Sequence, residues 1–438
     1  MRIVKWISWV ALSMSGCGQA VYPLSSNAQS QVYYVAANGS DANPGTQLRP
    51  FRTIQHGLNV AVRPGDVVRV RAGTYEGGIT FPVDGTASRP IVLENYPGER
   101  PFISGADGVA QKLVRIFNRS HVRFRGFEVG DLSATSPFES GAIFVEGYGG
   151  DIEISGNYVH DVEPKAHTYA NGRAIQVRGY YQSRSLQHIL VSGNEIDRCR
   201  VEDGNVLEIS GNSAQVRVLG NRMREDAGIA LNITGGTKPP RYTRWDVQVR
   251  DVVVDANDVD DTLGAGAIGL YIQAAKDAEV RRNRVQHSSW GLYVTSEYPG
   301  VHSQAIVVAD NFIAHNAEAG LLIGSPFFPT AVLGAIVHGN TVIGNGRFEA
   351  GNGGNFGIGR ARDVRVYDNK FFAADDHALT YLGAPYTHVT LNKNCYFAGH
   401  HSAATARFGY AGITYTGFSR YQTGTGQDLS STFGRPCD

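Results

Sequence analysis

The sequence predicts an all-β solenoid, a parallel β-helix of about ten coils. Three observations predict it. A segment of the form apolar-x-apolar-x-x-Asn recurs every 25 to 37 residues along most of the chain. Short strands with alternating apolar and polar residues fill the intervals, and no helical periodicity separates them. The composition, with 42% hydrophobic and 18% charged residues, excludes a disordered chain or a coiled coil.

The repeated asparagine is the most regular feature of the chain. Stacked at one bend, its amide can bond the coils above and below, in or near the left-handed conformation that asparagine tolerates. We therefore expect a structural ladder without a catalytic role. A β-propeller would need about 40 residues and four strands per repeat. The ladder positions are Asn157, Asn194, Asn221, Asn257, Asn283, Asn311, Asn340, Asn369 and Asn394.

Residues 1–17 have the features of a secretory signal. Arg2 and Lys5 precede an apolar stretch too short for a bilayer, which needs about 20 residues. The following residues 14–17 (MSGC) resemble a bacterial lipobox, in which Cys17 becomes lipidated. An ordinary cleaved signal is the alternative. We expect export to the bacterial cell surface, the outer membrane or the medium, with membrane contact only through this anchor.

The rest of the chain divides into a polar tether (18–30), an N-terminal cap with the first coils (31–110), the β-helix (111–400) and a C-terminal cap or tail (401–438). Cys395 and Cys437 are candidates for a disulfide in an oxidising compartment. Cys199 is expected to be a buried small hydrophobe. A capped solenoid of this kind is expected to be a monomer.

The opening of the chain carries a family resemblance. The segments Tyr33–Thr46, Pro50–Gln55, Pro64–Asp66 and Arg71–Tyr75 resemble the opening of secreted right-handed parallel β-helix proteins of the pectate lyase-like superfamily. The resemblance covers residues 32 to about 400 and implies a short capping helix over 51–62. Many such proteins are polysaccharide lyases, and others are hydrolases or epimerases. The opening indicates the fold, while function depends on later coils.

Coil length indicates where a binding groove lies. The steps from Asn157 to Asn194 and from Asn221 to Asn257 are long, at 37 and 36 residues. The inserted residues 163–173 and 235–245 are rich in basic and aromatic side chains, and insertions on a solenoid usually form its binding face. Glu202, Asp203 and Glu208 lie between them, so the sequence predicts an acidic floor with basic and aromatic walls.

Strand alternation predicts which side chains face this groove. Because Ile175 and Val177 point inward, Gln176 and Arg178 point outward. Neighbouring coils lie about 4.8 Å apart, so Arg178 and Glu208 are expected to be neighbours. The same rule continues the outward surface through Ser210, Asn232, Tyr271, Gln273, Tyr293 and Thr295.

The charge distribution suggests an acidic sugar polymer as the partner. The net charge is zero, which excludes a general nucleic-acid binder. Residues 165–250 nevertheless hold 13 basic and 8 acidic side chains, a net charge of +5. Arginine and aromatic rings suit carboxylates and sugar faces, although ordinary solvated charge ladders are the alternative. Glu146, Arg217 and Glu297 are assigned to such solvated faces.

The leading functional hypothesis is a lyase that cleaves a uronate-containing polysaccharide by β-elimination. Such a site neutralises the substrate carboxylate, removes the C5 proton and protonates the leaving oxygen. Arg178 is the candidate carboxylate clamp, and Lys165, His167 and Lys238 are candidate bases. Glu202, Asp203 and Glu208 are candidate Ca²⁺ ligands. Substrate contacts are expected from Arg173, Tyr180, Glu208, Asn232, Arg241, Tyr271 and Tyr293.

Three alternatives remain on the same fold. A glycoside hydrolase needs two carboxylates about 5 to 9.5 Å apart, for which Glu208 with Asp203 or Asp226 are candidates. A uronate epimerase and a non-catalytic glycan-binding surface protein are the other two.

Overall fold

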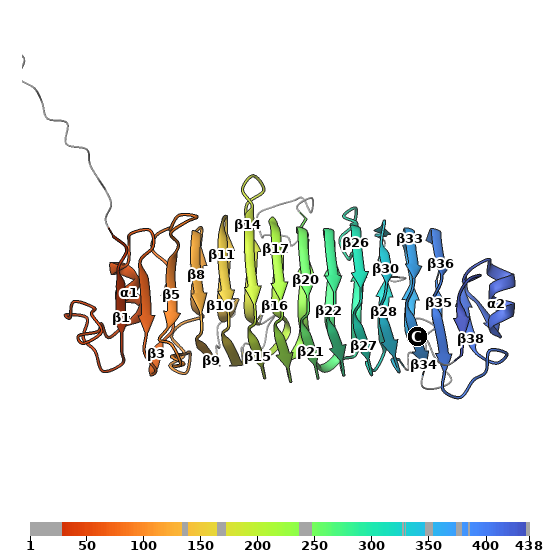
Figure 1. Cartoon of the computed structure of the whole chain (residues 1–438), viewed down its shortest axis with the longest axis horizontal. Coiled ribbons are helices and arrows are strands. Elements are labelled where there is room, and N and C mark those ends of the chain that lie inside the picture. The colour runs from red at the N-terminus through yellow and green to blue at the C-terminus, as the bar shows by residue number, and fades with distance from the viewer. Residues whose placement is uncertain are drawn as a thin grey trace, which may run out of the picture.

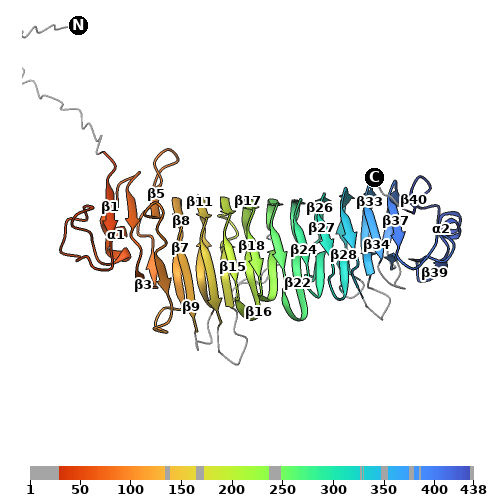
Figure 2. The ribbon, with the colours of Figure 1, turned by 60° about the horizontal axis from the view of Figure 1, so that its bottom comes forward.

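Three parallel sheets run along the whole molecule. The computed structural model describes residues 29–133, 139–163, 172–235, 248–325, 328, 330–346, 354–373, 379–383 and 386–434. Its short strands stack coil upon coil along one axis, with α1 (Ile54–Val60) at one end and α2 (Phe418–Thr425) at the other (Figures 1 and 2). The expected parallel β-helix is therefore confirmed.

Each coil contributes strands to three sheets, here named A, B and C. The pairings described within them are parallel except for β38 with β39. Sheet A contains β1 (Val32–Val35), β2 (Val67–Val70), β5 (Ile91–Asn95), β8 (Ser120–Arg125), β11 (Gly149–Ser155), β14 (Leu186–Ser192), β17 (Ser213–Leu219), β20 (Arg250–Asp255), β23 (Lys276–Arg281), β26 (Ser303–Ala309), β29 (Val332–Leu333), β30 (Ile336–His338), β33 (Ala361–Tyr367) and β36 (Tyr386–Asn392). Sheet B contains β3 (Thr74–Glu76), β6 (Phe102–Ser104), β9 (Glu128–Leu132), β12 (Tyr158–Val162), β15 (Glu195–Asp197), β18 (Arg222–Arg224), β21 (Asp258–Asp260), β24 (Arg284–Gln286), β27 (Phe312–Ala314), β31 (Thr341–Ile343), β34 (Lys370–Ala373), β37 (Cys395–Ala398) and β40 (Thr432–Phe433). Sheet C contains β4 (Ile79–Thr80), β7 (Lys112–Phe117), β10 (Ser140–Gly147), β13 (Gly172–Gly179), β16 (Arg200–Gly211), β19 (Ala227–Thr234), β22 (Leu263–Gln273), β25 (Trp290–Thr295), β28 (Ala319–Ile323), β32 (Gly354–Ile358), β35 (Thr380–Leu382), β38 (Arg407–Tyr410) and β39 (Ile413–Thr416).

The core is a continuous apolar column inside the coils. Ile175 and Val177 of β13 and Leu207 and Ile209 of β16 point inward and are fully buried, as the alternation predicted. Each such side chain stabilises the fold by about 1.5–3 kcal/mol, and it is buried by neighbouring coils rather than within its own. The stack is therefore held together coil by coil.

The asparagine ladder is confirmed at all nine positions. From Asn157 to Asn369, each side-chain Nδ2 donates to the Oδ1 of the asparagine one coil further on, at 2.9–3.1 Å. The expected left-handed conformation is found instead at the preceding residue, for example Gly156 (φ 61°), Ala256 (φ 55°) and Asp310 (φ 56°). That residue makes the bend, and the asparagine after it satisfies the backbone N–H groups exposed there.

A second, shorter ladder occupies the bend between sheets B and C. Asn316 donates to Asn345 at 2.8 Å, and Asn345 donates to Asn355 at 3.2 Å. In preceding coils the corresponding bend holds Cys199, Asp226 and Ser288. The sequence analysis missed this ladder because the residue type changes from coil to coil.

Both ends of the stack are closed by local structure. The helix expected over 51–62 is present as α1, which begins after the N-cap Thr53 and buries Ile54 and Leu58 against the first coil. At the other end the ladder terminates on Asp428, which accepts from Asn394 Nδ2 at 3.0 Å.

The cysteines agree with the expectations where the structure describes them. Cys199 is a free thiol buried in the core, and burial raises its pKa. Cys395 is disulfide-bonded, while Cys437 lies outside the described residues. Neither described helix is long and apolar enough to span a membrane.

Candidate functional site

A network of charged and polar side chains lies on the outer face of sheet C, over strands β7 to β16. The rule that placed Ile175 and Val177 inside places Gln176 and Arg178 on this face. The register then sets Gln176 opposite Glu208. We call the following set the polar network: Lys112, Arg115, Glu139, Glu146, Arg173, Gln176, Arg178, Tyr180, Asn205, Glu208 and Ser210.

Glu208 is the centre of the polar network and is only 1% exposed. Its carboxylate accepts from Arg173 Nε at 2.7 Å and from Arg178 Nη2 at 3.0 Å. Asn205 and Ser210 also donate to it, each at 2.6 Å. Burial alone would raise the pKa of Glu208, but the two arginines and these hydrogen bonds bring the pKa well below its usual range. Glu208 therefore stays ionised.

Glu146 is a second buried carboxylate, and its assignment to a solvated strand face was wrong. It is 0% exposed and lies 2.5 Å from Lys112 Nζ and 2.6 Å from Arg115 Nε. Tyr180 donates its hydroxyl to the same carboxylate. Burial opposes ionisation, yet Lys112, Tyr180 and Arg115 lower the pKa of Glu146. Burial and the negative charge of Glu146 raise the pKa of Tyr180, which keeps its proton.

Glu139 connects these two centres. It accepts from Arg178 Nη1 at 2.9 Å and from Gln176 Nε2 at 2.8 Å, and it lies 3.4 Å from Lys112. Arg178 thus bridges Glu139 and Glu208. Within the polar network four cations face three carboxylates, which leaves one positive charge in excess.

An aromatic cluster continues the same face over β22 to β28. Its members are Tyr271, Tyr293 and Leu322, with Ile229, Ile268 and Trp290 packed against them. The rings of Tyr271 and Tyr293 are 5.3 Å apart, and those of Trp290 and Tyr293 are stacked at 5.7 Å. Burial raises the pKa of Tyr293 to about 12. Asn232 of β19 lies opposite Glu208 on one side and Tyr271 on the other, so it joins the cluster to the polar network.

The predicted site residues that the structure describes lie together on the outer face of sheet C. Arg173, Arg178, Tyr180 and Glu208 lie in the polar network, and Asn232 bonds to it through Asn205 at 3.0 Å. Tyr271 and Tyr293 lie in the aromatic cluster. Lys165, His167, Lys238 and Arg241 lie outside the described residues, as do the side chains of Glu202 and Asp203.

Five members of the polar network were missed by sequence reasoning, and one of them is Asn205 of β16. Lys112 and Arg115 belong to β7, before the long coils, and Glu139 and Glu146 lie in or next to β10. Alternation with the buried Val114 and Ile116 would have placed Arg115 on the outer face. No local signal showed that Glu146, Gln176 and Glu208 on the outer face of sheet C are buried.

Asp226 does not face the groove, so its proposed pairing with Glu208 as hydrolase carboxylates was wrong. It lies at the bend between sheets B and C, is 1% exposed, and accepts from the Cys199 backbone N–H at 2.8 Å. Burial raises the pKa of Asp226 well above its usual value, which favours the protonated acid inside the coil.

Calcium fits Glu208 poorly. Both of its oxygens already accept hydrogen bonds at 3.0 Å or less, and two of the donors are arginines. A divalent cation at this position would displace those donors and face their positive charge.

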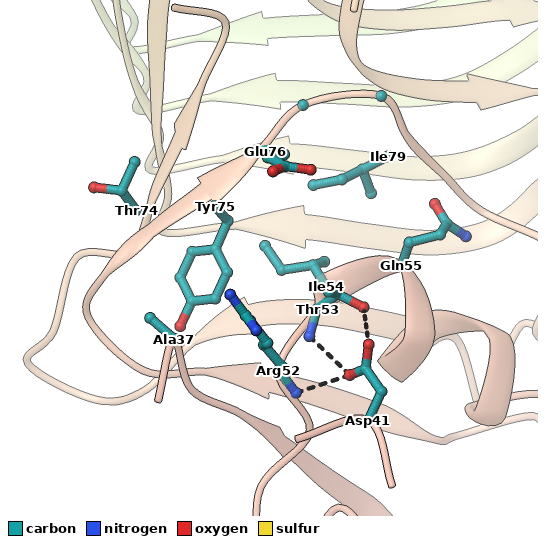
Figure 3. Close-up of a pocket in the computed structure, with 12 residues that line it drawn as sticks. Ala37, Asp41, Arg52, Thr53, Ile54, Gln55, Thr74, Tyr75, Glu76 and Ile79 are labelled. Carbon is teal, nitrogen blue, oxygen red and sulfur yellow. Dashed lines mark hydrogen bonds between the residues drawn. The ribbon is translucent and has the colours of Figure 1, made fainter. Parts of the chain in front are cut away.

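Polar side chains also gather at two other places, beside α1 and on sheet B. A cavity of about 580 Å³ lies beside α1, where Asp41 accepts from the backbone N–H groups of Arg52 and Thr53 at 2.8 and 2.9 Å (Figure 3). These bonds hold the N-terminal loop against the helix.

On sheet B, ligand atoms of Asp131, His160 and Asp161 lie within 4.8 Å of one another. The His160 ring nitrogens already meet carboxylates, of Asp161 at 2.7 Å and Glu128 at 3.1 Å.

Comparison with known proteins supports the fold assignment. Residues 33–191 match the family described as Pel9A-like, right handed beta helix region. The uncharacterized protein YwoF of Bacillus subtilis (strain 168) is 28% identical over 305 residues, which cover 66% of this chain and 64% of that protein. The match thus spans less than two thirds of the relative.

Solved structures share the architecture at low sequence identity. XylC in complex with xylose has a TM-score of 0.52 at 12% identity, covering 86% of this chain and 87% of that one. An alginate lyase from Paenibacillus sp. str. FPU-7 has a TM-score of 0.52 at 13% identity, covering 76% and 99%. The GH136 lacto-N-biosidase from Eubacterium ramulus has a TM-score of 0.51 at 11% identity, covering 92% and 67%. The chain therefore has the right-handed parallel β-helix fold, as the resemblance of its opening to pectate lyase-like proteins implied.

Proposed function

We propose that the protein is an extracytoplasmic carbohydrate-active protein that binds an acidic polysaccharide along the outer face of sheet C and cleaves it by β-elimination. The observation that carries the proposal is the charge of the polar network. Four cations surround three carboxylates there, and an anionic ligand would balance the remaining positive charge. Lys112 and Arg115 are 21% and 38% exposed, so this end of the network is open to a ligand.

The aromatic cluster supports a sugar polymer over a small anion. Aromatic side chains stack on sugar faces, and the half-buried Trp290 borders the cluster on the same face as the cations, whereas Tyr271 and Tyr293 are buried beneath that surface. Neighbouring coils are about 4.8 Å apart, so the two regions together offer several successive contacts to an extended chain. Alginate lyase activity in a protein of the same fold is compatible with this substrate class.

Elimination fits the ionisation of the network better than hydrolysis does. A glycoside hydrolase requires one carboxylic acid with a raised pKa to protonate the leaving oxygen. The pKa values of Glu146 and Glu208 are instead lowered, so neither is suited to that role. In a lyase the arginines neutralise the uronate carboxylate and thereby acidify the C5 proton. Lys165, His167 and Lys238 remain the predicted bases, and Glu202 and Asp203 the predicted calcium ligands.

The test is to incubate the purified chain with polygalacturonate, polymannuronate and polyguluronate, with dextran as a neutral control, in calcium or in chelator. Ultraviolet absorbance detects 4,5-unsaturated uronates, and a reducing-end assay detects hydrolysis. Unsaturated ends support the lyase. Reducing ends without unsaturation indicate a hydrolase, deuterium uptake at C5 without cleavage indicates an epimerase, and binding without any product indicates a glycan-binding protein.

Two variants locate the activity. Arg178→Ala should weaken binding of the acidic polymer by about 10- to 100-fold, because a charged hydrogen-bond donor is lost. Arg217→Ala is the matched control, since Arg217 is an exposed arginine of β17 in sheet A. If both changes weaken binding equally, or if neither change affects binding, the placement of the site on sheet C is contradicted.

A further inference from the structure

Two buried amide oxygens flank Glu208 and have no partner within the described part of the chain. They are Gln176 Oε1 and Asn232 Oδ1. Gln176, Glu208 and Asn232 lie directly opposite one another on β13, β16 and β19. The two amide side chains are 0% and 3% exposed. Buried polar atoms are nearly always hydrogen-bonded, so two unpaired acceptors in one row point to an external donor.

The orientation of both amides follows from Glu208. A carboxylate only accepts hydrogen bonds, so a neighbouring amide must turn its N–H₂ group toward it. Gln176 Nε2 donates to Glu139 at 2.8 Å and to Glu208 at 3.4 Å, which leaves Oε1 free.

The Asn232 amide is oriented by Glu208 through one intermediate residue, Asn205. Asn205 Nδ2 donates to Glu208 at 2.6 Å, so Asn205 Oδ1 must accept. It accepts from Asn232 Nδ2 at 3.0 Å, which leaves Asn232 Oδ1 free. Glu208 thus acts as a positioning residue that turns both carbonyl oxygens away from itself.

We infer that these two oxygens receive hydrogen bonds from free hydroxyl groups of the bound polymer, and that the site therefore discriminates against O-acylated chains. An acyl ester removes the hydroxyl proton, so the buried acceptor would stay unpaired. The oxygens belong to strands two positions apart, about 10 Å, which exceeds one sugar ring, so they contact different sugar units. This inference rests on the proposed function, because it assumes a polysaccharide on sheet C.

The substrate side of the test needs no variant. Polygalacturonate and polymannuronate, each with free hydroxyls and after chemical O-acetylation, are titrated against the purified chain by calorimetry. We expect acetylation to weaken binding by about tenfold or more. Equal affinity for both forms would overturn the inference while leaving the proposed function intact. No binding of any uronate polymer would overturn the proposed function and this inference with it.

The second part of the test replaces the two amide side chains with apolar side chains of similar size. Gln176→Met and Asn232→Leu should each weaken binding of the unmodified polymer by about tenfold and reduce its preference over the acetylated form. Gln187→Met, at an exposed glutamine of β14 in sheet A, is the control and should change neither. Thermal unfolding verifies that each variant is folded. If both sheet C variants bind like the parent chain, water occupies these acceptors and the inference is wrong.

Discussion

The asparagine ladder and the polar network are both buried and both contain side-chain amides, but they differ in how completely their hydrogen bonds are satisfied. Every ladder amide between Asn157 and Asn369 donates to the next asparagine and receives from the one before or from Phe127. The polar network holds seven charged side chains and, with Asn232, presents unpaired acceptors. A structural element needs all hydrogen bonds of its repeated side chains to be made, whereas unpaired buried groups and excess charge are typical of a ligand site.

The largest effect on stability is expected in the middle of the ladder. Asn283→Leu removes two donated bonds, to Asn311 and to the Val254 carbonyl, and two bonds accepted from Asn257. Because the former partners stay buried and unpaired, the free energy of unfolding should fall by about 3–5 kcal/mol. Urea unfolding measures this loss. Polymer binding by the folded fraction should be unchanged, and a loss of binding equal to that of Arg178→Ala would break the distinction between the two systems.

Glu208→Gln should rank next and should affect both stability and binding. Removing this carboxylate leaves Arg173 and Arg178 partly uncompensated, at a cost of about 3 kcal/mol at pH 7.

The lowered pKa of Glu208 predicts how that cost depends on pH. The stabilisation from Glu208 is present above its unfolded pKa of about 4.3 and is lost as the pH falls below it toward the folded value. The stability difference between parent and Glu208→Gln should therefore shrink below about pH 4. A difference that stays constant from pH 7 to pH 3 would show that the carboxylate is not held ionised.

Asp226→Asn should stabilise the protein. Asp226 occupies the bend that asparagine takes at Asn316, where Nδ2 donates to Asn345 and to the Val285 carbonyl. In the parent, Asp226 Oδ2 has no hydrogen-bond partner within the described residues. A neutral amide removes the cost of keeping a buried carboxyl group protonated, so we expect a gain of about 1–3 kcal/mol at pH 7.

The sign of the pH dependence is opposite to that of Glu208. The pKa of Asp226 is raised, so its stability contribution is fully present below the unfolded value of about 3.9 and is lost as the pH rises toward the folded value. The gain from Asp226→Asn should be absent near pH 3 and grow toward neutrality. Denaturant unfolding across this range tests it, and a gain already present at pH 3 would contradict a protonated Asp226.

The smallest effect on stability is expected for Asn232→Leu. Among the described residues the parent side chain donates one hydrogen bond, to Asn205 at 3.0 Å, and carries an unpaired oxygen. Its removal should therefore change the free energy of unfolding by about 1 kcal/mol or less. Set against Asn283→Leu, this variant compares two buried asparagines in one protein. A cost as large as that of Asn283→Leu would place Asn232 among the structural amides.

Much of the fold was predictable from local patterns. The nine ladder positions, the inward residues such as Ile175 and the outward row from Gln176 to Tyr293 all follow from a two-residue alternation and a recurring bend. The proximity of Arg178 and Glu208 was also expected, because neighbouring coils place outward residues side by side, whereas their ion pair was not. These predictions needed only the chain's own periodicity.

The composition of the candidate site depended on contacts between coils. The sequence predicts that Glu146 lies on a solvated surface, yet Lys112 and Arg115 of the preceding coil surround it. In the sequence, Asp226 is a candidate for the groove, yet the bend directs its side chain into the core beside Cys199.

The amino-acid sequence by itself determined the coil period, the direction of each strand residue and the asparagine ladder, because these depend on residues a few positions apart. Only the tertiary structure decided which outward residues are buried, which carboxylates are paired and which amide oxygens stay free. The partners concerned are about 30 residues apart in sequence, as Glu146 and Arg115 are, and they meet only when the register between coils is set. Burial and pairing then decide the ionisation of each group, and with it the chemistry available on sheet C.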